Sequence, residues 1–270
     1  MDPRSIFAPD LFAGTTAIVT GGGTGIGRAT ALGFARYGAS VVLASRNVDN
    51  LRAVGEEIDA DGGAHLVVET NIRDIDAVER LRDTALDRFG AVDFVVNNAG
   101  GQFMAPPSAI SDNGWRAVVD LNLHGTWNMC SRFLPHLIDR GRGTIVNVVH
   151  AYTGERGAPM FAHSGAARAG VIGLTRSLAP YAEAAGVTVN AMAPGNTMSA
   201  KAAANYGYTE DEWRATQPRA KWADPEEIAA ILLFLCSPAA RMINGAVIVA
   251  DAASTQVNWP ILDDMLDGSA

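Results

Sequence analysis

The sequence predicts an α/β fold built on a doubly wound parallel sheet of about seven strands, with helices on both faces. Short apolar runs alternate with amphipathic helical patterns along the whole chain. The runs are continuously apolar, which is typical of strands covered on both faces. A glycine-rich stretch, TGGGTGIGR from Thr20 to Arg28, joins the first run to the first helical pattern. This order of strand, turn and helix is typical of the Rossmann type of fold.

The apolar runs and helical periodicities divide the chain into alternating strands and helices after a polar lead-in over residues 1–14. Strands are expected at Ala17–Thr20, Val41–Ser45, His65–Glu69, Val92–Val96, Thr144–Val149, Val187–Ala191 and Ala246–Ala250. Helices are expected from Ile26 onward and at Asp49–Ala60, Asp74–Phe89, Ser111–Asp139, Phe161–Glu183 and Pro225–Cys236. Residues 199–218 are expected to form a helical flap, within a substrate segment at about 196–220. No break in composition divides the chain, so one domain over residues 1–270 is expected.

The composition excludes several classes of function. The net charge is −8 and no block of Lys or Arg stands out, which argues against a nucleic-acid surface. No segment reaches about 18 uninterrupted apolar residues and no signal peptide is evident, so we expect no membrane span and a cytoplasmic protein. Cys130 and Cys236 lie in apolar helical contexts and are expected to be buried thiols. The five histidines have no metal-ligand spacing, so no metal site is expected.

The glycine-rich stretch is the strongest candidate for a cofactor site. Gly21, Gly25 and Gly27 allow a tight turn and a close approach of the backbone to a ligand. Free N–H groups and the positive end of the following helix face a pyrophosphate in such a turn. The spacing reads T-G-x-x-x-G-x-G and so differs from the strict G-x-G-x-x-G pattern. Its place after a strand and at the start of a helix still favours a nicotinamide dinucleotide.

The end of the second expected strand indicates which nicotinamide cofactor binds. An acidic residue at this place holds the ribose hydroxyls of NAD, whereas this chain has Ser45 and Arg46. A hydroxyl and a guanidinium would bind a 2′-phosphate through charge-assisted hydrogen bonds. We therefore expect NADP(H), with a solvated surface charge as the alternative for Arg46. Asn71, after the third strand, either contacts adenine or forms a turn.

Four motifs in order give the chain a resemblance to a known family. Thr20–Gly27, Asn97–Gly100, Asn122 and Pro194-Gly195 together resemble the short-chain dehydrogenases/reductases over nearly the whole chain. The resemblance implies that Asn97–Gly100 supports the sheet and the cofactor pocket, and that Asn122 distorts its helix around a water in a proton relay. It implies that Pro194-Gly195 approaches the nicotinamide carboxamide. It also implies a homotetramer assembled through the two long helices.

The chain departs from the family at the positions that usually carry catalysis. The family has a Ser after the fifth strand and a Tyr and a Lys spaced Y-x-x-x-K on the next helix. Aligned on the family's A-G-V-I-G-L-T run, this chain has Ser164 at the Tyr position and Arg168 at the Lys position. The Ser position falls at either His150 or Ala151. A Ser hydroxyl is far less acidic than a phenol and Arg stays charged, so the site serves a conventional alcohol dehydrogenase poorly.

These substitutions instead resemble the coenzyme-A-linked enoyl and 2,4-dienoyl reductases of the family. HSGAARAGV from His163 to Val171, NNAGGQF from Asn97 to Phe103, and the tail Asn258-Trp259-Pro260 resemble the peroxisomal trans-2-enoyl-CoA reductases. In the dienoyl reductases a Tyr after the fifth strand replaces the missing helix Tyr, and Tyr152 matches it. An amide shares the substrate carbonyl there, and Gln102 matches it. Donors at these positions would stabilise the negative charge that hydride addition places on a thioester oxygen.

These inferences define the expected site. The expected catalytic residues are Tyr152, Gln102, Ser164, Arg168 and Asn122. The expected cofactor-binding residues are Gly21, Gly23, Thr24, Gly25, Ile26, Gly27, Ser45, Arg46, Asn71, Ile72, Asn98, Ala99, Gly100, Arg168, Pro194, Gly195 and Thr197. The expected substrate-binding residues are Phe103, Met160, His163 and Met198, with Met104 and Trp213 as further candidates for an acyl pocket. His150 is either a second acid/base group or a buried histidine at a strand end.

The reaction expected is NADPH-dependent reduction of a C=C bond in a 2-enoyl- or 2,4-dienoyl-CoA thioester. The expected partner is therefore a small acyl-CoA-like molecule. Two alternatives stay open because a fold does not fix a function. One is carbonyl or alcohol redox on a small hydrophobic or terpenoid substrate. The other is a cofactor-binding protein without catalysis, which the loss of the usual Tyr and Lys favours.

Overall fold

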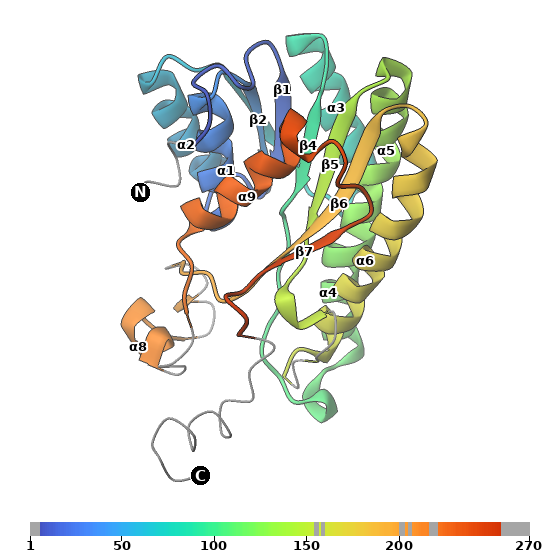
Figure 1. Cartoon of the computed structure of the whole chain (residues 1–270). Helices are drawn as coiled ribbons and strands as arrows, with labels where there is room; N and C mark the ends of the chain where they lie inside the picture. The colour runs from blue at the N-terminus through green and yellow to red at the C-terminus, as the bar shows by residue number, and fades with distance from the viewer. Residues whose placement is uncertain are drawn as a thin grey trace, which may run out of the picture.

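The computed structural model describes residues 6–153, 157, 160–199, 203–204, 207–215 and 221–254. Within these residues the strands form one seven-stranded sheet in the order β3-β2-β1-β4-β5-β6-β7, and each neighbouring pair is parallel (Figure 1). The strands are β1 Thr16–Thr20, β2 Ser40–Ser45, β3 His65–Glu69, β4 Phe94–Asn97, β5 Gly143–Val148, β6 Val187–Pro194 and β7 Val247–Ala250. The expected α/β fold with a doubly wound parallel sheet is confirmed.

Helices cover both faces of the sheet (Figure 1). The described helices are α1 Gly25–Arg36, α2 Val48–Ala60, α3 Ile75–Phe89, α4 Asp112–Val119, α5 Gly125–Arg140, α6 Ala162–Glu183, α8 Glu210–Ala215 and α9 Pro225–Cys236. One core cluster joins α1, α2 and α9 to the sheet, with Phe34 and Leu233 among its buried residues. The other joins α3, α5 and α6 to the opposite face, with Leu81 and Phe133 buried. Burying each such side chain contributes roughly 1.5–3 kcal/mol to the stability of the fold. The two clusters therefore hold in place the strands whose carboxyl ends carry the site.

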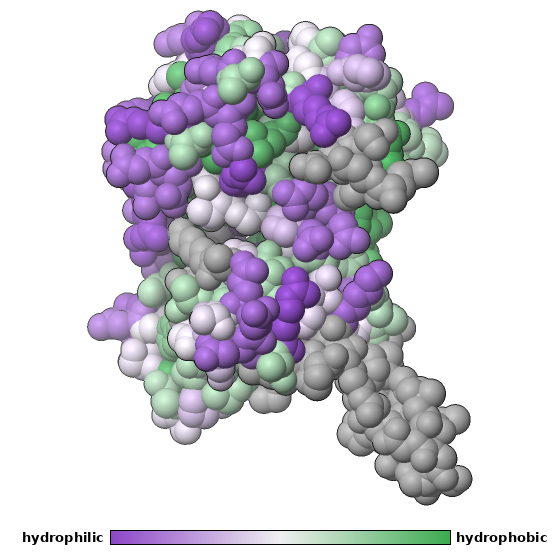
Figure 2. Space-filling model, turned by 90° about the vertical axis from the view of Figure 1, so that its left-hand side faces the viewer, coloured by the Kyte–Doolittle hydropathy of each residue, from purple (hydrophilic) through white to green (hydrophobic). Residues whose placement is uncertain are grey.

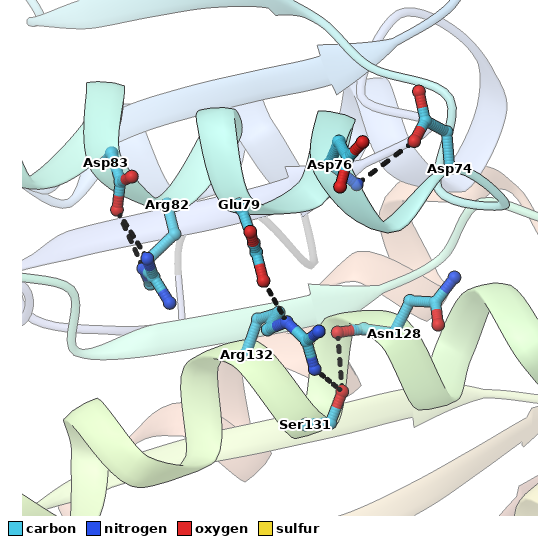
Figure 3. A network of polar contacts seen from close by, with 8 residues as sticks. All are labelled: Asp74, Asp76, Glu79, Arg82, Asp83, Asn128, Ser131 and Arg132. Atoms are coloured by element: carbon cyan, nitrogen blue, oxygen red, sulfur yellow. Dashed lines mark hydrogen bonds and ion pairs between the residues drawn. The ribbon is translucent and has the colours of Figure 1, made fainter.

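A polar network on the surface ties α3 to α5 (Figure 3). Arg132 of α5 donates from Nε to Glu79 of α3 at 2.8 Å and from Nη1 to Ser131 at 3.2 Å. One turn away, Asn128 donates from Nδ2 to the carbonyl oxygen of Ile72 at 2.9 Å. The packing of α5 against α3 therefore fixes the loop after β3, where Ile72 is expected to contact the cofactor.

Most expected elements lie within two residues of the observed bounds, whereas two differ further, one in continuity and one in length. The long helix expected at Ser111–Asp139 consists of α4 and α5, joined by a π-helical turn over Asp120–His124. β6 extends beyond Ala191 to Pro194 because its last residue pairs in register with Ala250 of β7.

The flap expected as a helix over residues 199–218 is only partly helical. Its described residues are helical at 203–204 and in α8, and the chain turns at Gly207, where φ is +80°. Rings of Tyr208, Trp213 and Trp222 pack together there, with centroids 5.3 and 6.1 Å apart along the series. Trp213 is therefore part of an aromatic cluster within the flap. The tail Asn258-Trp259-Pro260 lies outside the described residues.

Figure 2 shows hydrophilic residues over much of the face turned toward the viewer, with hydrophobic residues between them. No helix within the described ranges is long and apolar enough to cross a membrane.

Cys130 and Cys236 are buried free thiols, as expected. Burial raises the pKa of Cys130 to about 12, so its thiol stays protonated.

Candidate active site

A cavity of about 930 Å³ opens at the carboxyl ends of the strands. The turn after β1, the end of β2, the loops after β3 and β4, and the end of β6 all contribute to its wall. This is the place where the chain passes from one half of the sheet to the other, between β1 and β4. Of the expected cofactor residues, the wall includes Gly21, Thr24, Gly25, Ile26, Ser45, Arg46, Asn71, Ile72, Asn98, Ala99, Gly100, Arg168, Pro194 and Thr197.

The glycine turn is fastened to the end of β4 by backbone and side-chain hydrogen bonds. Thr20 Oγ1 accepts from the N–H groups of Asn98 and Ala99 at 3.0 and 2.9 Å. The Asn98 amide donates to the carbonyl oxygen of Thr20 at 2.9 Å. A Cβ on Gly27 would collide with the Gly21 carbonyl oxygen and lie 2.5 Å from the Asn98 amide. Gly27 therefore serves the close packing of helix on turn.

Gly23 is another position where packing leaves no room for a side chain. A Cβ there would lie 2.8 Å from Cβ of Asn50 in α2. Neither Gly23 nor Gly27 belongs to the cavity wall. The two glycines shape the turn, and their neighbours face the cavity.

The first turn of α1 leaves backbone donors available to a ligand. Its N-cap residue Thr24 is extended, with φ −152° and ψ 158°, and its side chain caps no N–H group. The first turn carries no acidic residue. Uncapped N–H groups and the positive helix end together favour an anion such as a pyrophosphate.

The wall beyond β2 and β3 carries polar side chains. Ser45 Oγ accepts from the N–H of Asn47 at 3.2 Å, which holds its hydroxyl at the strand end. Arg46 is exposed and forms no ion pair with any residue that the structure describes. Asn71 both lines the cavity and shapes a turn, because its Oδ1 accepts from Arg73 N and Nε at 3.3 and 3.2 Å.

Asn122 accounts for the π-helical turn. Its Nδ2 donates to the carbonyl oxygen of Val118 at 2.8 Å and to that of Gly101 at 2.7 Å. Its Oδ1 accepts from Gly101 N–H at 3.2 Å. The side-chain amide thus uses the Val118 carbonyl oxygen, which would otherwise accept a backbone hydrogen bond within the helix. The same amide holds the loop after β4 through Gly101. This buried amide distorts the helix next to the site, as the resemblance implies.

Arg168 projects from α6 to the floor of the cavity. Its Nη1 donates to the carbonyl oxygen of Val148, the last residue of β5, at 2.6 Å. Its guanidinium also lies against Gly100, where a Cβ would collide with Nη2 and lie 2.7 Å from Asn122 Oδ1. Arg168 and Asn122 therefore meet at Gly100, as two of the expected catalytic residues.

Ser164, Gln102 and His150 form a polar cluster beneath the cavity. Ser164 Oγ lies 2.5 Å from Oε1 of Gln102 and 3.4 Å from Nε2 of His150. Burial, together with the charge of Arg168, lowers the pKa of His150 to about 3. Of the two positions open for the family's Ser, His150 and Ala151, the histidine is the one that meets Ser164. Sequence reasoning left His150 out of the catalytic set because one residue of loop length decides which side chain points inward.

Tyr152 lies apart from this cluster, in the short 3-10 turn Ala151–Thr153. Burial and the nearby Asp251 carboxylate raise the pKa of Tyr152, and a hydrogen bond with the Ser254 side chain opposes this rise. The Tyr152 and His150 rings are 6.2 Å apart between centroids. The Tyr152 hydroxyl thus faces the segment after β7, and its side chain is not part of the cavity wall.

The segment after β7 is held close to the end of β6. A Cβ on Gly195 would lie 2.6 Å from Cα of Asp251, so only glycine permits this approach. Ala252 and Ala253 both have positive φ, +51° and +63°, in the left-handed region. Asp251 Oδ1 accepts from the N–H of Ala253 at 2.9 Å and stabilises this turn. Tyr152 and Gly195 are therefore positioned by a segment about 60 residues beyond β6.

The four expected substrate residues Phe103, Met160, His163 and Met198 do not belong to the cavity wall. His163 is fully buried, and its Nδ1 accepts from the Ser164 N–H at 2.8 Å, so it caps the start of α6. The Phe103 ring meets the His163 ring edge-on, with centroids 4.4 Å apart. Met160 accepts from Ala105 N–H at 3.0 Å and is partly exposed, whereas Met198 is buried.

These features define a Rossmann-type α/β fold with a cavity at the carboxyl ends of its strands, and comparisons with known proteins specify the family. The family model described as enoyl-(acyl carrier protein) reductase matches residues 21–255. The peroxisomal 2,4-dienoyl-CoA reductase [(3E)-enoyl-CoA-producing] of Pongo abelii is 33% identical over 255 residues, 93% of this chain and 87% of that protein.

Solved structures agree with this assignment. The citronellol catabolism dehydrogenase AtuB of Pseudomonas aeruginosa PAO1 is similar with a TM-score of 0.81 and 37% identity, over 93% of this chain and 98% of that chain. An actinorhodin polyketide ketoreductase with NADPH is similar with a TM-score of 0.83 and 26% identity, over 88% of this chain and 96% of that chain. The chain belongs to the short-chain dehydrogenase/reductase family of oxidoreductases, which bind a nicotinamide cofactor.

Proposed function

We propose that the protein reduces the C=C bond of a 2-enoyl- or 2,4-dienoyl-CoA thioester with NADPH. The observation that carries this proposal is the hydrogen bond between Ser164 and Gln102. It lies at the position where carbonyl reductases of the family have an acidic tyrosine. The dienoyl-CoA reductase of Pongo abelii, similar over most of the chain, supports the same substrate class.

The described groups around Ser164 donate hydrogen bonds but do not deliver a proton at neutral pH. The pKa of His150 is lowered to about 3, so its ring is neutral. The pKa of Tyr152 is raised, so its phenol keeps its proton. Arg168 is permanently charged and a serine hydroxyl is a very weak acid. Reduction of a ketone needs an acid to protonate the alkoxide, and this set of groups serves that step poorly.

Reduction of a conjugated thioester needs donors instead. Bound NADPH would supply a hydride to the carbon at the end of the conjugated system that is farther from the carbonyl. The electron pair of the double bond moves toward the thioester oxygen, and water then protonates the neighbouring carbon. The Gln102 amide lies in the cavity wall, and we propose that its N–H₂ group donates to that oxygen. One such donor lowers the barrier by on the order of 3 kcal/mol.

The cavity wall fits a dinucleotide with a 2′-phosphate. The uncapped N–H groups at the start of α1 would hold the pyrophosphate. Gly27 gives this turn its shape, because a Cβ there would collide with the Gly21 carbonyl oxygen. Ser45 and Arg46 would hold the 2′-phosphate, and Arg46 has no ion pair within the described part of the chain. Asn71 and Ile72 would contact the adenine, and Pro194 and Thr197 the nicotinamide end. This donor set supports NADP(H) over NAD(H).

Steady-state assays with purified protein test the proposal. NADPH oxidation is measured with a 2-enoyl-CoA, a 2,4-dienoyl-CoA, an aldehyde and a ketone of similar chain length. We expect turnover with an enoyl or dienoyl thioester that exceeds turnover with either carbonyl compound at least tenfold. Oxidation of NADPH by the carbonyl compounds alone would overturn the proposal.

Tyr152 is proposed as a second donor to the thioester oxygen. Its neutral phenol suits that role, and a substrate would have to replace its hydrogen bond with Ser254. Tyr152→Phe should lower turnover at least tenfold while NADPH affinity stays the same. Tyr181→Phe, on the exposed side of α6, is the matched control. Unchanged turnover in Tyr152→Phe would leave Gln102 as the donor and remove Tyr152 from the mechanism.

One observation favours a second candidate function, redox of an alcohol or carbonyl on a small hydrophobic substrate. It is the similarity to the citronellol catabolism dehydrogenase, at 37% identity. The same assays, run in the reverse direction with NADP⁺ and a primary terpenoid alcohol, separate the two functions.

We further propose one domain over residues 1–270, a cytoplasmic location and a homotetramer. Small residues line the exposed side of α6 at Ala166, Ala169 and Gly173, and a Cβ on Gly173 would meet open space. Gly170 instead packs against Leu123 within the subunit. Light scattering after size exclusion tests the assembly, and a monomer would contradict it.

A further inference from the structure

Three polar side chains from different segments follow one another beneath the cavity. Gln102, in the loop after β4, belongs to the cavity wall. Ser164 of α6 is fully buried behind it, and its Oγ lies 2.5 Å from Gln102 Oε1. His150, after β5, reaches the same hydroxyl with Nε2 at 3.4 Å. Only Gln102 of the three lies in the wall, so the other two act on a ligand through it.

The separations determine which group donates to which. Hydrogen bonds between two oxygens are 2.5–3.0 Å long, whereas those from nitrogen to oxygen are about 2.7–3.2 Å. The contact joins Ser164 Oγ to Oε1 of Gln102, so the serine hydroxyl donates and the amide oxygen accepts. The serine has one proton, which this bond uses. The carbonyl end of the Gln102 amide consequently points to Ser164, and Nε2 is the donor end of the same group.

The same count of protons fixes the tautomer of His150. Ser164 Oγ has only lone pairs left to offer, so its long contact with Nε2 of His150, at 3.4 Å, is a weak hydrogen bond only in the tautomer that carries the proton on Nε2. The ring is neutral, because burial and the Arg168 charge keep its pKa at about 3. Nδ1 is therefore unprotonated, and this buried atom has no hydrogen-bond partner among the described residues.

We propose that Ser164 and His150 are positioning residues, which hold the Gln102 amide with its N–H₂ end as the donor to the substrate carbonyl. The chain of donation runs from His150 Nε2–H to Ser164 Oγ–H and on to Gln102 Oε1. The substrate role of this amide rests on the proposed function, whereas the order of hydrogen bonds does not. A relay fixed in this direction prevents the amide from turning its oxygen toward an oxygen of the ligand.

Nuclear magnetic resonance of the ligand-free protein with ¹⁵N-labelled histidine tests the order of hydrogen bonds. The sequence has five histidines, so comparison with His150→Gln assigns the signal. We expect His150 to carry its proton on Nε2, with Nδ1 unprotonated from pH 6 to pH 8. In Ser164→Ala the Nε2–H signal should shift, because its acceptor is gone. A proton on Nδ1, or a signal indifferent to Ser164→Ala, would overturn the relay.

Kinetics separate positioning from acid catalysis. Arg168 is the charged group that faces His150 and Tyr152 is the titratable ring beside it, so no group of the cluster titrates between pH 6 and pH 8. We expect a flat pH profile of kcat in that range. His150→Phe should lower kcat about tenfold with KM for NADPH within twofold, and His150→Gln, which keeps an N–H donor, should recover most of it. His124→Gln, at an exposed histidine, is the control.

The outcomes distinguish the inference from the proposed function. A bell-shaped profile with a histidine-like pKa that His150→Gln abolishes would make His150 an acid and contradict its positioning role. The expected tautomer without turnover of any thioester would overturn the proposed function and leave the order of hydrogen bonds supported. A proton on Nδ1 in an active thioester reductase would overturn the inference alone.

Discussion

Arg168 donates from Nη1 to the carbonyl oxygen of Val148 at 2.6 Å, which ties α6 to the last residue of β5. The same guanidinium lies against Gly100, in the part of the loop after β4 that precedes Gln102. A planar guanidinium can donate to Val148 while it packs against Gly100, which a compact ammonium cannot. Arginine at this position therefore fixes the relative position of β4 and β5 at the cavity floor.

Arg168→Lys should weaken NADPH binding about tenfold, because one charge-assisted hydrogen bond, about 1.4 kcal/mol, is lost. Titration calorimetry measures the change in Kd. Arg176→Lys, on the exposed side of the same helix, should leave the Kd within twofold. An unchanged Kd in Arg168→Lys would show that the cofactor does not depend on the guanidinium geometry.

Gln102→Glu tests the donor in the cavity wall. The carboxylate can still accept from Ser164, but it has no N–H to offer the thioester oxygen. We expect kcat to fall about 100- to 1000-fold, as when an oxyanion donor is lost. NADPH affinity should change less than threefold. Asn113→Asp, the same chemical change at an exposed position on α4, should keep full turnover, and activity above a tenth of normal in Gln102→Glu would contradict the role.

Arg46→Ala tests the cofactor preference. The exposed guanidinium lines the cavity just after β2, which ends in Ser45, and the carboxylate nearest in sequence in the wall is Asp49 of α2. Its loss should raise the KM for NADPH by 10- to 100-fold, about 1.5–3 kcal/mol for hydrogen bonds to a charged group. The KM for NADH should stay within twofold. Arg80→Ala on α3 is the control, and equal effects on NADPH and NADH would contradict a 2′-phosphate contact at Arg46.

The half-buried His150 should make stability depend on pH. Its pKa falls from 6.5 to about 3 on folding, so the unfolded chain binds a proton first as the pH falls. The stabilisation is complete above pH 6.5 and is lost progressively toward pH 3. As the pH falls from 7 to 5, this group should lower the free energy of unfolding by about 2 kcal/mol. Urea unfolding of wild type and His150→Gln measures the difference, and parallel pH dependences would contradict a neutral half-buried ring.

Continuous apolar runs made the sheet predictable from the sequence. His65–Glu69 is a strand with the expected bounds, and Val41–Ser45 begins only one residue late, because parallel strands are buried on both faces. The start of a helix was predictable where the sequence contains a capping motif. Asp224 and Glu227 form a capping box at the start of α9, which begins at Pro225 as expected.

Side-chain directions at the strand ends were not predictable in the same way. Whether His150 or Ala151 meets Ser164 depends on one residue of loop length between β5 and α6. The orientation of Tyr152 depends on Asp251 and Ser254, about 100 residues further along the chain. No local sequence pattern predicts the contact of Tyr152 with Asp251 and Ser254, because it arises only when β6 and β7 pair in register. The cavity wall, built from strand ends and glycines, was accordingly easier to predict than the polar cluster beneath it.

The position at which a labelled hydride enters the product tests the central claim most directly. The protein is incubated with NADPH deuterated at the transferable position and a 2-enoyl-CoA or 2,4-dienoyl-CoA, and the product is examined by mass spectrometry and proton resonance. We predict one deuterium on a carbon of the former conjugated system, one solvent-derived hydrogen on another carbon, and an intact thioester. Deuterium on a carbinol carbon, or label left entirely in the cofactor while carbonyl compounds react, would contradict reduction assisted by the amide of Gln102.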